Sequence, residues 1–344
     1  MKKIIITGVT GQDGSHMADF LLKKPENYII GGVRRLSVPN HKNIDHLKDH
    51  PRFNLIDLDI TDHENTNYVI SEQQPDFFIN FAANSFVGKS WKMPINHMQT
   101  NCLAVCYQLD AIKNFSPNCR YYNAGTSEEF GDVVSTPQCE SHPLRPQSPY
   151  GASKCAARHM IRVYRESYDL FALQGWLFNH EGTRRGLEFV TRKITNGIAK
   201  IKIALETGDE IPVLKMGNLD SSRDWSDAED FMEGIWLMLT QDKPKEFVLS
   251  SGENHTIRDF IKICFNIAGI NYEQKGKGLD EKFLTKKGKT LIEINPEYYR
   301  PAEVNKLCGD STLAEKELNW KRKINFEDLV KKMYNNDYNL LKNE

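Results

Sequence analysis

The stretch "IIITGVTGQDGSHMADFLL", residues 4–22, decides the fold of this chain. Its β-branched start is typical of a buried strand, and the segment after Gly14 predicts a helix. Between the two, Gly8, Gly11 and Gly14 permit a tight turn, a close approach of backbone to a pyrophosphate, and close packing of helix on strand. The order strand, glycine turn, helix therefore predicts a dinucleotide-binding unit; a glycine-rich turn without a ligand is the alternative.

Six further short runs of β-branched and aromatic residues follow, with helical stretches between them. They are YIIGGV at 28–33, FNLIDL at 53–58, FFIN at 77–80, RYYNA at 120–124, LQGWLF at 173–178 and EFVLS at 246–250. Strands that alternate with helices form right-handed βαβ units and a parallel sheet buried on both faces. The sequence predicts an α/β fold, with a Rossmann-like doubly wound parallel sheet and a smaller C-terminal substrate-binding lobe.

The pattern becomes looser after residue 178. Apolar positions at helical spacing in "VTRKITNGIAKIKIAL" predict a helix, and "RDWSDAED" indicates the beginning of a return to the sheet. Later segments alternate short helices with Lys-rich loops such as "QKGKGLDEKFLTKKGKT". We expect a dinucleotide-binding domain over residues 1–178, joined by 224–250, and a second lobe made of 179–223 and 251–344.

Composition excludes several classes of protein. The 344 residues are 40% hydrophobic and 26% charged, with a formal net charge of -1, so nothing draws the chain toward nucleic acid or an anionic membrane. The seven cysteines form no CxxC pair and no zinc-like cluster, and their odd number argues against a disulfide framework. The apolar run after Met1 is too short for a secretory or spanning segment. We expect a cytoplasmic protein without a metal.

The end of the second predicted strand indicates which dinucleotide binds. An NAD site usually places a carboxylate about 20 residues after the last glycine, whereas this chain has Arg34 and Arg35. Two guanidinium groups suit the 2′-phosphate of NADP, and a solvated basic pair is the alternative. We therefore predict NADP. The predicted contacts in the glycine turn and at the carboxyl ends of later strands are Gly8, Thr10, Gly11, Gln12, Asp13, Gly14, Arg34, Arg35, Asp59, Ile60, Phe81, Ala82, Ala83 and Ser85.

Tyr150 and Lys154 stand four residues apart in "SPYGASK", so a helix places them on one face. An ammonium group and an oxidised nicotinamide both favour a phenolate, and we expect them to lower the pKa of Tyr150 from about 10 toward neutrality. Such a tyrosine accepts the proton of an alcohol as hydride leaves. YxxxK also occurs by chance, but here Thr126 offers a hydroxyl after the fifth strand. This set resembles the site of an extended short-chain dehydrogenase/reductase.

Glu128 adds a carboxylate that a simple reductase or epimerase does not need. Once C4 of a hexose has been oxidised to a ketone, the C5 proton is acidic enough for a carboxylate to remove. The protonated carboxyl can then give its proton to the departing 6-hydroxyl, and the stored hydride returns at C6. The result is an internal redox dehydration that consumes no NADP. The alternative role for Glu128 is to stabilise a helix N-terminus, for which Glu129, pointing elsewhere, is our candidate.

From end to end, the chain resembles the GDP-mannose 4,6-dehydratase family. The most specific segments are "LFNHEGTRRGLEFVTRKIT" at 177–195, "GNLDSSRDWSDAEDFMEGIWLML" at 217–239 and "YYRPAEVNKLCGDSTLAEKELNW" at 298–320. The resemblance implies conversion of GDP-mannose to GDP-4-keto-6-deoxymannose by a homodimer or homotetramer. It implies catalysis by Thr126, Glu128, Tyr150 and Lys154, cofactor contacts from Tyr150, Lys154, His180 and Arg185, and substrate contacts from Ser85, Asn179, Val190, Lys193, Arg223, Arg300 and Glu303.

Two short segments depart from the family pattern. Ala124-Gly125 stands where the family more often has Ala-Ser, and Gly182-Thr183 replaces a usual Ser-Pro. Both lie close to expected ligand sites. Three other functions stay open: a GDP-4-keto-6-deoxyhexose reductase, a dTDP- or CDP-hexose 4,6-dehydratase, and a cofactor-binding module without turnover.

Overall fold

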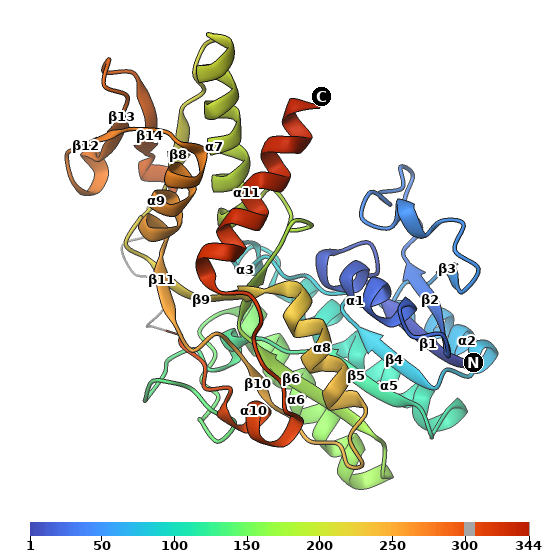
Figure 1. Ribbon diagram of the computed structural model, residues 1–344. Coiled ribbons are helices and arrows are strands. Elements are labelled where there is room, and N and C mark those ends of the chain that lie inside the picture. Colours follow the sequence, from blue (N-terminus) through green and yellow to red (C-terminus); the bar gives the residue numbers. More distant parts are fainter. Residues whose placement is uncertain (299–306, 344) are drawn as a thin grey trace.

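The computed structural model describes residues 1–298 and 307–343, and the strands in these residues form three sheets (Figure 1). The largest has the order β10-β6-β5-β4-β1-β2-β3, and all its neighbouring strands are parallel. Its strands are β1 (Lys2–Thr7), β2 (Asn27–Val33), β3 (Phe53–Asp57), β4 (Phe77–Asn80), β5 (Arg120–Ala124), β6 (Ala172–Leu177) and β10 (Val248–Leu249). After β3 the chain returns to pair β4 with β1, which makes the sheet doubly wound. The predicted fold class is confirmed.

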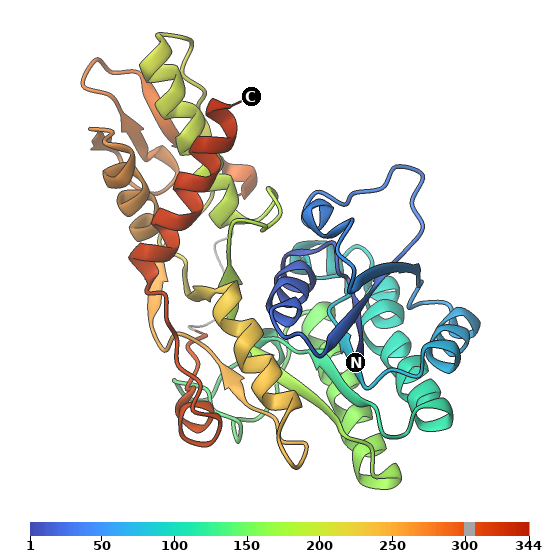
Figure 2. The same ribbon diagram turned by 45° about the vertical axis from the view of Figure 1, so that its right-hand side comes forward.

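Helices cover both faces of this sheet (Figure 2). One face carries α1 (Gln12–Leu22) and α8 (Ala228–Leu239), and the other carries α2 (His63–Gln73), α5 (Ala104–Phe115) and α6 (Pro149–Tyr168). Successive side chains of β1 serve the two cores in turn. Ile4 and Ile6 pack with α1 and α8, whereas Ile5 packs with α2, α5 and α6. This alternation is why a run of three isoleucines indicates a strand buried on both faces.

The glycine turn places the start of α1 beside the end of β4. Gly8 has a φ of +65°, and a Cβ there would lie 2.8 Å from the backbone nitrogen of Ala82. A Cβ on Gly14 would overlap the carbonyl oxygen of Gly8. Only glycine lets the turn pass this close to the neighbouring strand and lets the helix begin at once.

Two smaller sheets build the second lobe. The sheet β11-β9-β7 leads away from the large sheet, and β12-β13-β14-β8 lies at the far end of the lobe (Figure 1). Their strands are β7 (Asn179–Glu181), β8 (Leu214–Met216), β9 (Ser222–Asp227), β11 (Asn254–Thr256), β12 (Glu273–Lys275), β13 (Lys282–Leu284) and β14 (Thr290–Ile294). The long helices of the lobe, α7 (Val190–Thr207), α9 (Ile257–Ala268) and α11 (Phe326–Lys342), share one apolar core with β8, β9, β13 and β14.

Short helices connect these elements. They are α3 (Val87–Ser90), α4 (Pro94–Met98) and α10 (Thr312–Leu318), a π-helix at Gln99–Leu103, and 3-10 turns at Asp45–Leu47, Ser127–Glu129, Gly278–Asp280 and Pro296–Tyr298. Although we expected residues 251–344 in the second lobe, Ala314 and Leu318 of α10 pack in the same core as α1 and α8. The chain therefore crosses from the lobe to the sheet once more than the sequence indicated.

Two local expectations need correction. The segment "RDWSDAED" does not rejoin the large sheet as a strand, because β9 pairs with β7 and β11; the following α8 and β10 return instead. The Lys-rich segment expected as a loop contains β13 and the last two residues of β12. Phe283 is fully buried between exposed Lys282 and half-buried Leu284, so a single apolar side chain carries the packing of a strand that is polar elsewhere.

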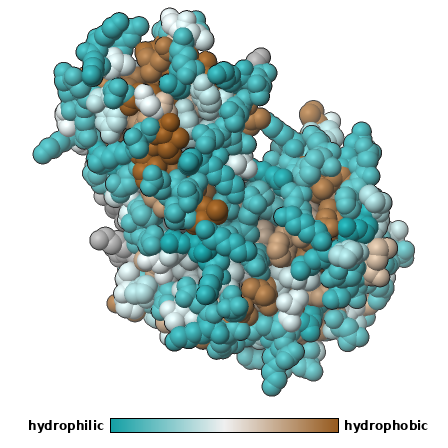
Figure 3. All heavy atoms as spheres, viewed as in Figure 1, coloured by the Kyte–Doolittle hydropathy of each residue, from teal (hydrophilic) through white to brown (hydrophobic). Residues whose placement is uncertain are grey.

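The surface shown in Figure 3 carries mostly hydrophilic residues, with hydrophobic ones in small separate areas. Within residues 1–298 and 307–343, none of the helices combines the length and apolar character needed to cross a bilayer. The seven cysteines, all in the described part of the chain, are free thiols.

Candidate active site

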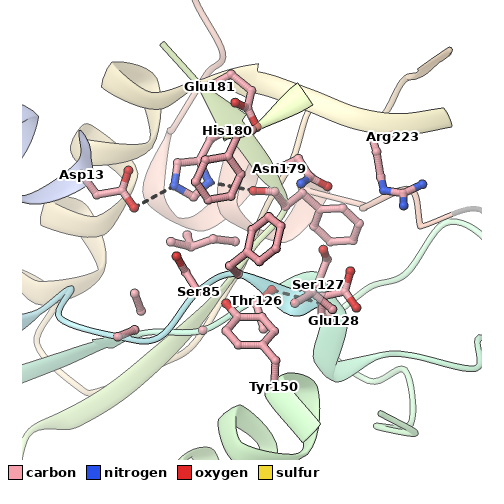
Figure 4. A pocket seen from close by; sticks show the side chains of 18 of the residues that line it. Asp13, Ser85, Thr126, Ser127, Glu128, Tyr150, Asn179, His180, Glu181 and Arg223 are labelled. Atoms are coloured by element: carbon pink, nitrogen blue, oxygen red, sulfur yellow. Dashed lines mark hydrogen bonds and ion pairs between the residues drawn. The ribbon is translucent and has the colours of Figure 1, made fainter. Parts of the chain in front are cut away.

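A cavity of about 410 Å³ opens at the carboxyl edge of the large sheet, where the second lobe meets it. Both parts of the molecule contribute to its wall, and Figure 4 shows Thr126, Glu128 and Tyr150 facing His180 across it. The predicted site residues in its lining are Asp13, Phe81, Ala83, Ser85, Thr126, Glu128, Tyr150, Lys154, Asn179, His180, Arg185, Val190 and Arg223. Segments as far apart as 13 and 223 are thus brought to one place.

A neighbouring groove of about 510 Å³ continues along the same edge and shares Ala83 with the first cavity. It is lined by most of the remaining residues predicted to bind the cofactor, namely Gly8, Thr10, Arg34, Arg35, Asp59, Ile60 and Ala82. Gly11, Gln12 and Gly14 shape the turn beneath it. The side chain of Gln12 is buried and donates to Asp13 Oδ1 at 3.0 Å and to the carbonyl oxygen of His180 at 3.1 Å.

A tight 3-10 turn after β5 orients the predicted acid/base. Thr126 begins this turn, and its Oγ1 accepts a hydrogen bond from the backbone N–H of Glu128 at 3.3 Å. The N–H of Thr126 donates to Oε1 of Glu129 at 2.9 Å. Glu129 is fully buried beneath the turn, whereas Glu128 lines the cavity. The structure places the two carboxylates as we expected, on opposite sides of the turn.

The environment of Glu128 favours a carboxyl group that can hold a proton. Burial raises the pKa of Glu128, and the positive charge of Arg223 acts in the opposite direction. Both side chains lie on the same side of the cavity in Figure 4. A carboxyl with a raised pKa exchanges protons closer to neutral pH than an exposed glutamate does.

Helix α6 begins in a way that positions Tyr150 and Lys154. Ser148 Oγ accepts from the N–H of Gly151 at 3.0 Å, and Pro149 occupies the first helical turn, where its missing N–H costs nothing. Tyr150 therefore stands at the helix start and Lys154 one turn later, and both side chains are buried. Lys154 Nζ donates to the carbonyl oxygen of Ala124 at 2.8 Å, so the lysine ties α6 to the end of β5.

One electrostatic expectation is wrong for the side chains by themselves. Burial raises the pKa of Tyr150, and the hydrogen bond that Thr126 makes with it acts in the opposite direction without cancelling this effect. The charges of Glu128 and Glu129 raise the pKa further. Burial also lowers the pKa of Lys154 to about 8. The site excludes the water that would solvate a phenolate, and this raises the pKa of Tyr150 in the protein without its cofactor.

His180 and Arg185 lie at the opposite wall. Nε2 of His180 is 3.0 Å from Asp13 Oδ2, and Nδ1 is 2.8 Å from the carbonyl oxygen of Phe178. Burial opposes a charge on His180, but the Asp13 carboxylate outweighs it and the pKa of His180 is raised. The guanidinium of Arg185 lies 3.6 Å from the centre of the Phe189 ring.

Predicted substrate residues extend into a third cavity of about 310 Å³, which shares Val190, Arg223 and Trp225 with the first. Lys193 lines it, with Nζ 4.2 Å from the centre of the Tyr298 ring. Arg300 and Glu303, two other predicted substrate contacts, lie outside the described residues. The structure thus brings the predicted site residues that it describes to three adjoining cavities, except Gly11, Gln12 and Gly14, which lie in the turn beneath the second.

The sequence did not indicate the aromatic part of this site. Phe86 and Phe189 line the first cavity, with ring centres 6.1 Å apart in an edge-on arrangement, and Trp225 joins the first and third cavities. Their only signal in the sequence is a place next to predicted contacts, because Phe86 follows Ser85 and Phe189 precedes Val190. Ser127 and Glu181 also line the cavity without having been predicted.

The two departures from the family pattern have structural correlates. A Cβ on Gly125 would overlap the carbonyl oxygen of Gly175 and lie 2.7 Å from Glu129 Oε1. A Cβ on Gly182 would only touch Gln12 Oε1 at 3.5 Å and His16 Nε2 at 3.7 Å. Both of these buried atoms lack a hydrogen-bond partner among the described residues. Gly125 is therefore required by packing, whereas Gly182 leaves room for a small polar side chain.

A doubly wound sheet with a glycine turn, and a cavity holding Thr126, Tyr150 and Lys154 at its carboxyl edge, define a protein of the extended short-chain dehydrogenase/reductase class. Within this class the chain belongs to the GDP-mannose 4,6-dehydratase family, whose sequence model matches residues 5–333. Similar curated proteins are GDP-mannose 4,6-dehydratases of Vibrio cholerae, 40% identical over 98% of this chain and 93% of that protein, and Homo sapiens, 39% identical over 98% and 92%.

Solved structures share the fold at lower sequence identity. A dTDP-glucose 4,6-dehydratase from Bacillus anthracis, in complex with NAD, has a TM-score of 0.80 at 21% identity and is matched over 100% of this chain and 98% of its own. The structure of RMD from Pseudomonas aeruginosa, complexed with NADPH, has a TM-score of 0.77 at 20% identity, over 99% and 100% of the two chains.

Proposed function

We propose that this chain is a lyase that converts GDP-mannose to GDP-4-keto-6-deoxymannose and water with NADP as a bound cofactor. One observation carries the proposal: a carboxyl group with a raised pKa, that of Glu128, lies in the same cavity as Thr126, Tyr150 and Lys154. A reductase or an epimerase has no use for this fourth group. The family to which the chain belongs supports GDP-mannose as the sugar nucleotide.

The cofactor groove fits NADP. Its glycine turn leaves no side chain between the backbone and a pyrophosphate, and α1 points its N-terminus at the same place. At the end of β2 the exposed side chains of Arg34 and Arg35 line the groove and match the charge of a 2′-phosphate. Proteins of the same fold have been solved with NAD and with NADPH. When bound, oxidised NADP accepts a hydride from C4 of the sugar and returns it at C6.

Tyr150 is proposed as the group that takes the proton of the 4-hydroxyl. Its hydrogen bond to Thr126 orients the phenol, and Lys154, held at the carbonyl oxygen of Ala124, supplies positive charge from the next turn of α6. Because burial raises the pKa of Tyr150, its phenolate is a strong base toward the 4-hydroxyl, and the proton that it takes is the one proposed to reach C5 after elimination.

Glu128 is proposed to remove the C5 proton from the 4-keto sugar. The C6–O bond then breaks, and the protonated Glu128 gives its proton to the departing hydroxide, which leaves as water. A double bond forms between C5 and C6 and is removed when C6 gains the hydride and C5 gains the proton from Tyr150. The sum is the loss of one water, with Glu128 restored as a carboxylate, Tyr150 as a phenolate and the cofactor in its oxidised form.

Substrate binding is proposed for Ser85, Asn179, Val190 and Arg223 in the first cavity and for Lys193 in the third. Arg223 is suited to a pyrophosphate oxygen because its guanidinium can bind it bidentately. Only the resemblance to the family supports Arg300 and Glu303 as substrate contacts. We further propose that the protein forms a homodimer or homotetramer and that it lies in the cytoplasm. Light scattering of the purified protein measures the oligomeric state.

The test is incubation of the purified protein with GDP-mannose and NADP, followed by mass spectrometry for the loss of one water. The decisive variant is Glu128→Gln, for which kcat should fall by about 10²-fold or more. The variant should still oxidise C4, and one equivalent of NADPH should accumulate and absorb at 340 nm. A matched control is Asp132→Asn, whose carboxylate pairs with Arg145 outside the cavity and whose loss should leave kcat unchanged.

Each alternative function gives a different outcome. A reductase would keep full activity as Glu128→Gln and would act on the keto product in place of GDP-mannose. A dehydratase of another sugar nucleotide would release water from dTDP-glucose or CDP-glucose but not from GDP-mannose. A non-catalytic module would bind NADPH and form no product with any of the three.

A further inference from the structure

A buried ion pair lies directly behind the turn that carries Thr126 and Glu128. The carboxylate of Glu129 is fully buried and Arg158 of α6 is 4% exposed. Nε of Arg158 donates to Oε2 of Glu129 at 2.5 Å. Among the described residues that line the three cavities, neither of the two appears. The pair therefore touches the site only through other residues.

The carboxylate of Glu129 is fixed by bonds to three different segments. Its Oε1 accepts from the N–H of Thr126 at 2.9 Å and from Nε2 of Gln174 at 3.0 Å, and Arg158 donates to both carboxylate oxygens. Arg158 is itself held by the carbonyl oxygen of Gln174 at 2.6 Å and by Glu246 Oε2 at 2.9 Å. Its guanidinium lies 3.5 Å from the centre of the Trp176 ring.

The same network reaches Lys154. Gln174 Nε2, which bonds Glu129, also donates to the carbonyl oxygen of Lys154 at 3.0 Å. The ammonium of Lys154 is bonded to Ala124, two residues before Thr126, whose N–H bonds Glu129. Glu129 and Lys154 are both buried, so the attraction between their charges is weakly screened.

Stability alone is a poor explanation for this pair. Two charges removed from water lose much of what they gain by attraction, and apolar side chains of similar volume commonly serve a core as well or better. Here the pair also demands Gly125, since a Cβ at that position would lie 2.7 Å from Glu129 Oε1 and 2.9 Å from Arg158 Nη2. A buried carboxylate with these packing requirements indicates a functional role for Glu129 at the site.

We propose that Glu129 is a positioning residue of the dehydratase site: locked by Arg158, its carboxylate fixes the backbone of Thr126 and faces the ammonium of Lys154 with a negative charge. The inference rests on the proposed function for its effect on turnover. The effect of Glu129 on the pKa of Lys154 does not depend on substrate or on turnover.

Several charged groups surround Lys154, and the signs of their charges determine in which direction each moves the pKa of Lys154. Asp13 of α1 and Glu129 of the turn raise the pKa of Lys154 against the larger effect of burial, which brings it to about 8. Tyr150 and Arg158 stand on its own helix, and Glu128 lies on the same turn as Glu129. Removing the charge of Glu129 must lower the pKa of Lys154 further, so the ammonium is lost at a lower pH.

The first experiment compares Glu129→Gln with Glu246→Gln. Both variants break one ion pair of Arg158, but Glu246 has no bond to Thr126. We expect Glu129→Gln to lower kcat about tenfold or more, to leave KM for GDP-mannose within about twofold, and to move the alkaline limb of the kcat profile down by about half a pH unit or more. Glu246→Gln should keep the native alkaline limb. Superimposable limbs in all three proteins would overturn the proposal.

The second experiment does not depend on turnover. The protein is labelled with ¹⁵N-lysine, and the Nζ signal of Lys154, assigned by its loss in Lys154→Met, is titrated by NMR without substrate. The native protein and Glu246→Gln should titrate together, and Glu129→Gln should titrate at lower pH. This titration tests the role of Glu129 even if GDP-mannose proves not to be the substrate. If Glu129→Gln titrates like the native protein, the proposed role is wrong even in an active dehydratase.

A conservative variant separates charge from position and covers the case in which Glu129→Gln does not fold. Glu129→Asp keeps the charge but withdraws the carboxylate from the Thr126 N–H. We expect a lower kcat, an unchanged KM and a native alkaline limb. A kcat equal to the native value, or a limb displaced as far as in Glu129→Gln, would contradict the proposal.

Discussion

The carboxylate of Asp13 lies 3.0 Å from Nε2 of His180 and joins the glycine turn to the first strand of the second lobe. A second bond runs beside it, from Gln12 Nε2 to the carbonyl oxygen of His180 at 3.1 Å. The side chains of Asp13 and His180 both line the first cavity, opposite Tyr150 (Figure 4). The relative position of the two walls of the site therefore depends on this contact.

Replacing His180 by Gln should lower the free energy of unfolding by about 1–3 kcal/mol in a pH-dependent way. The raised pKa of His180 means that its charge stabilises the fold fully below 6.5 and loses this effect as the pH rises through the raised value. The pKa of Asp13 is lowered, so its contribution is present above 3.8 and is lost only as the pH falls through that lowered value.

Urea unfolding at pH 5.5 and pH 9 checks this prediction. The difference between native protein and variant should be larger at the lower pH. His46→Gln is the control, because His46 pairs with Asp19 at 2.7 Å but is 47% exposed, and its loss should cost little. An equal difference at both pH values would mean that His180 stabilises the fold without its charge.

Replacing Arg34 or Arg35 by Ala should weaken NADPH binding by about 10-fold or more and leave NADH binding nearly unchanged, since a hydrogen bond to a charged group contributes about 1.5–3 kcal/mol. Both guanidinium groups are exposed at the rim of the cofactor groove, where only a 2′-phosphate would need them. Fluorescence titration with the two dinucleotides measures the effect, with Lys42→Ala as a neighbouring charge control. Equal weakening of both dinucleotides would argue against recognition of the phosphate.

Gly182→Ser should raise the free energy of unfolding by about 0.5–1.5 kcal/mol, because its hydroxyl can donate to Gln12 Oε1 and bond His16 Nε2. Both atoms are buried without a partner in the described part of the chain, and a Cβ fits between them. Gly182→Ala is the matched control, since it adds the Cβ without the hydroxyl. Thermal unfolding separates the two, and equal melting temperatures would show that the buried atoms are satisfied in some other way.

Gly125→Ala should destabilise the protein by about 1–3 kcal/mol or more, because the new methyl group would overlap the carbonyl of Gly175 and crowd Glu129 and Arg158. Activity should fall as well, since Thr126 follows directly. Gly182→Ala, where the added Cβ has ordinary contacts, again serves as the control. A melting temperature equal to that of the native protein would show that β5 and β6 separate without cost.

Much of the sheet domain follows from local sequence. The strands were predicted correctly because β-branched runs alternate between two buried faces, and the glycine turn because only glycine fits beside Ala82. The spacing of Tyr150 and Lys154 and the place of Thr126 after β5 predict these three residues for the site, and all three line one cavity. The sequence did not predict the strand β13, because Phe283 is the single fully buried residue of its three. The pairing of Phe86 with Phe189 has no local signal either, because the two residues meet only when the lobe is placed against the sheet.

The amino-acid order by itself determined the doubly wound sheet, the nucleotide turn and the set of polar side chains at the sheet's carboxyl edge. Periodicity and short spacings fix these features, and each depends on neighbours along the chain. Tertiary structure alone decided that Arg158 is the buried partner of Glu129, and that burial raises the pKa of Tyr150. Charge states of this kind depend on how much water and which distant groups surround a side chain, and only the packed fold specifies both.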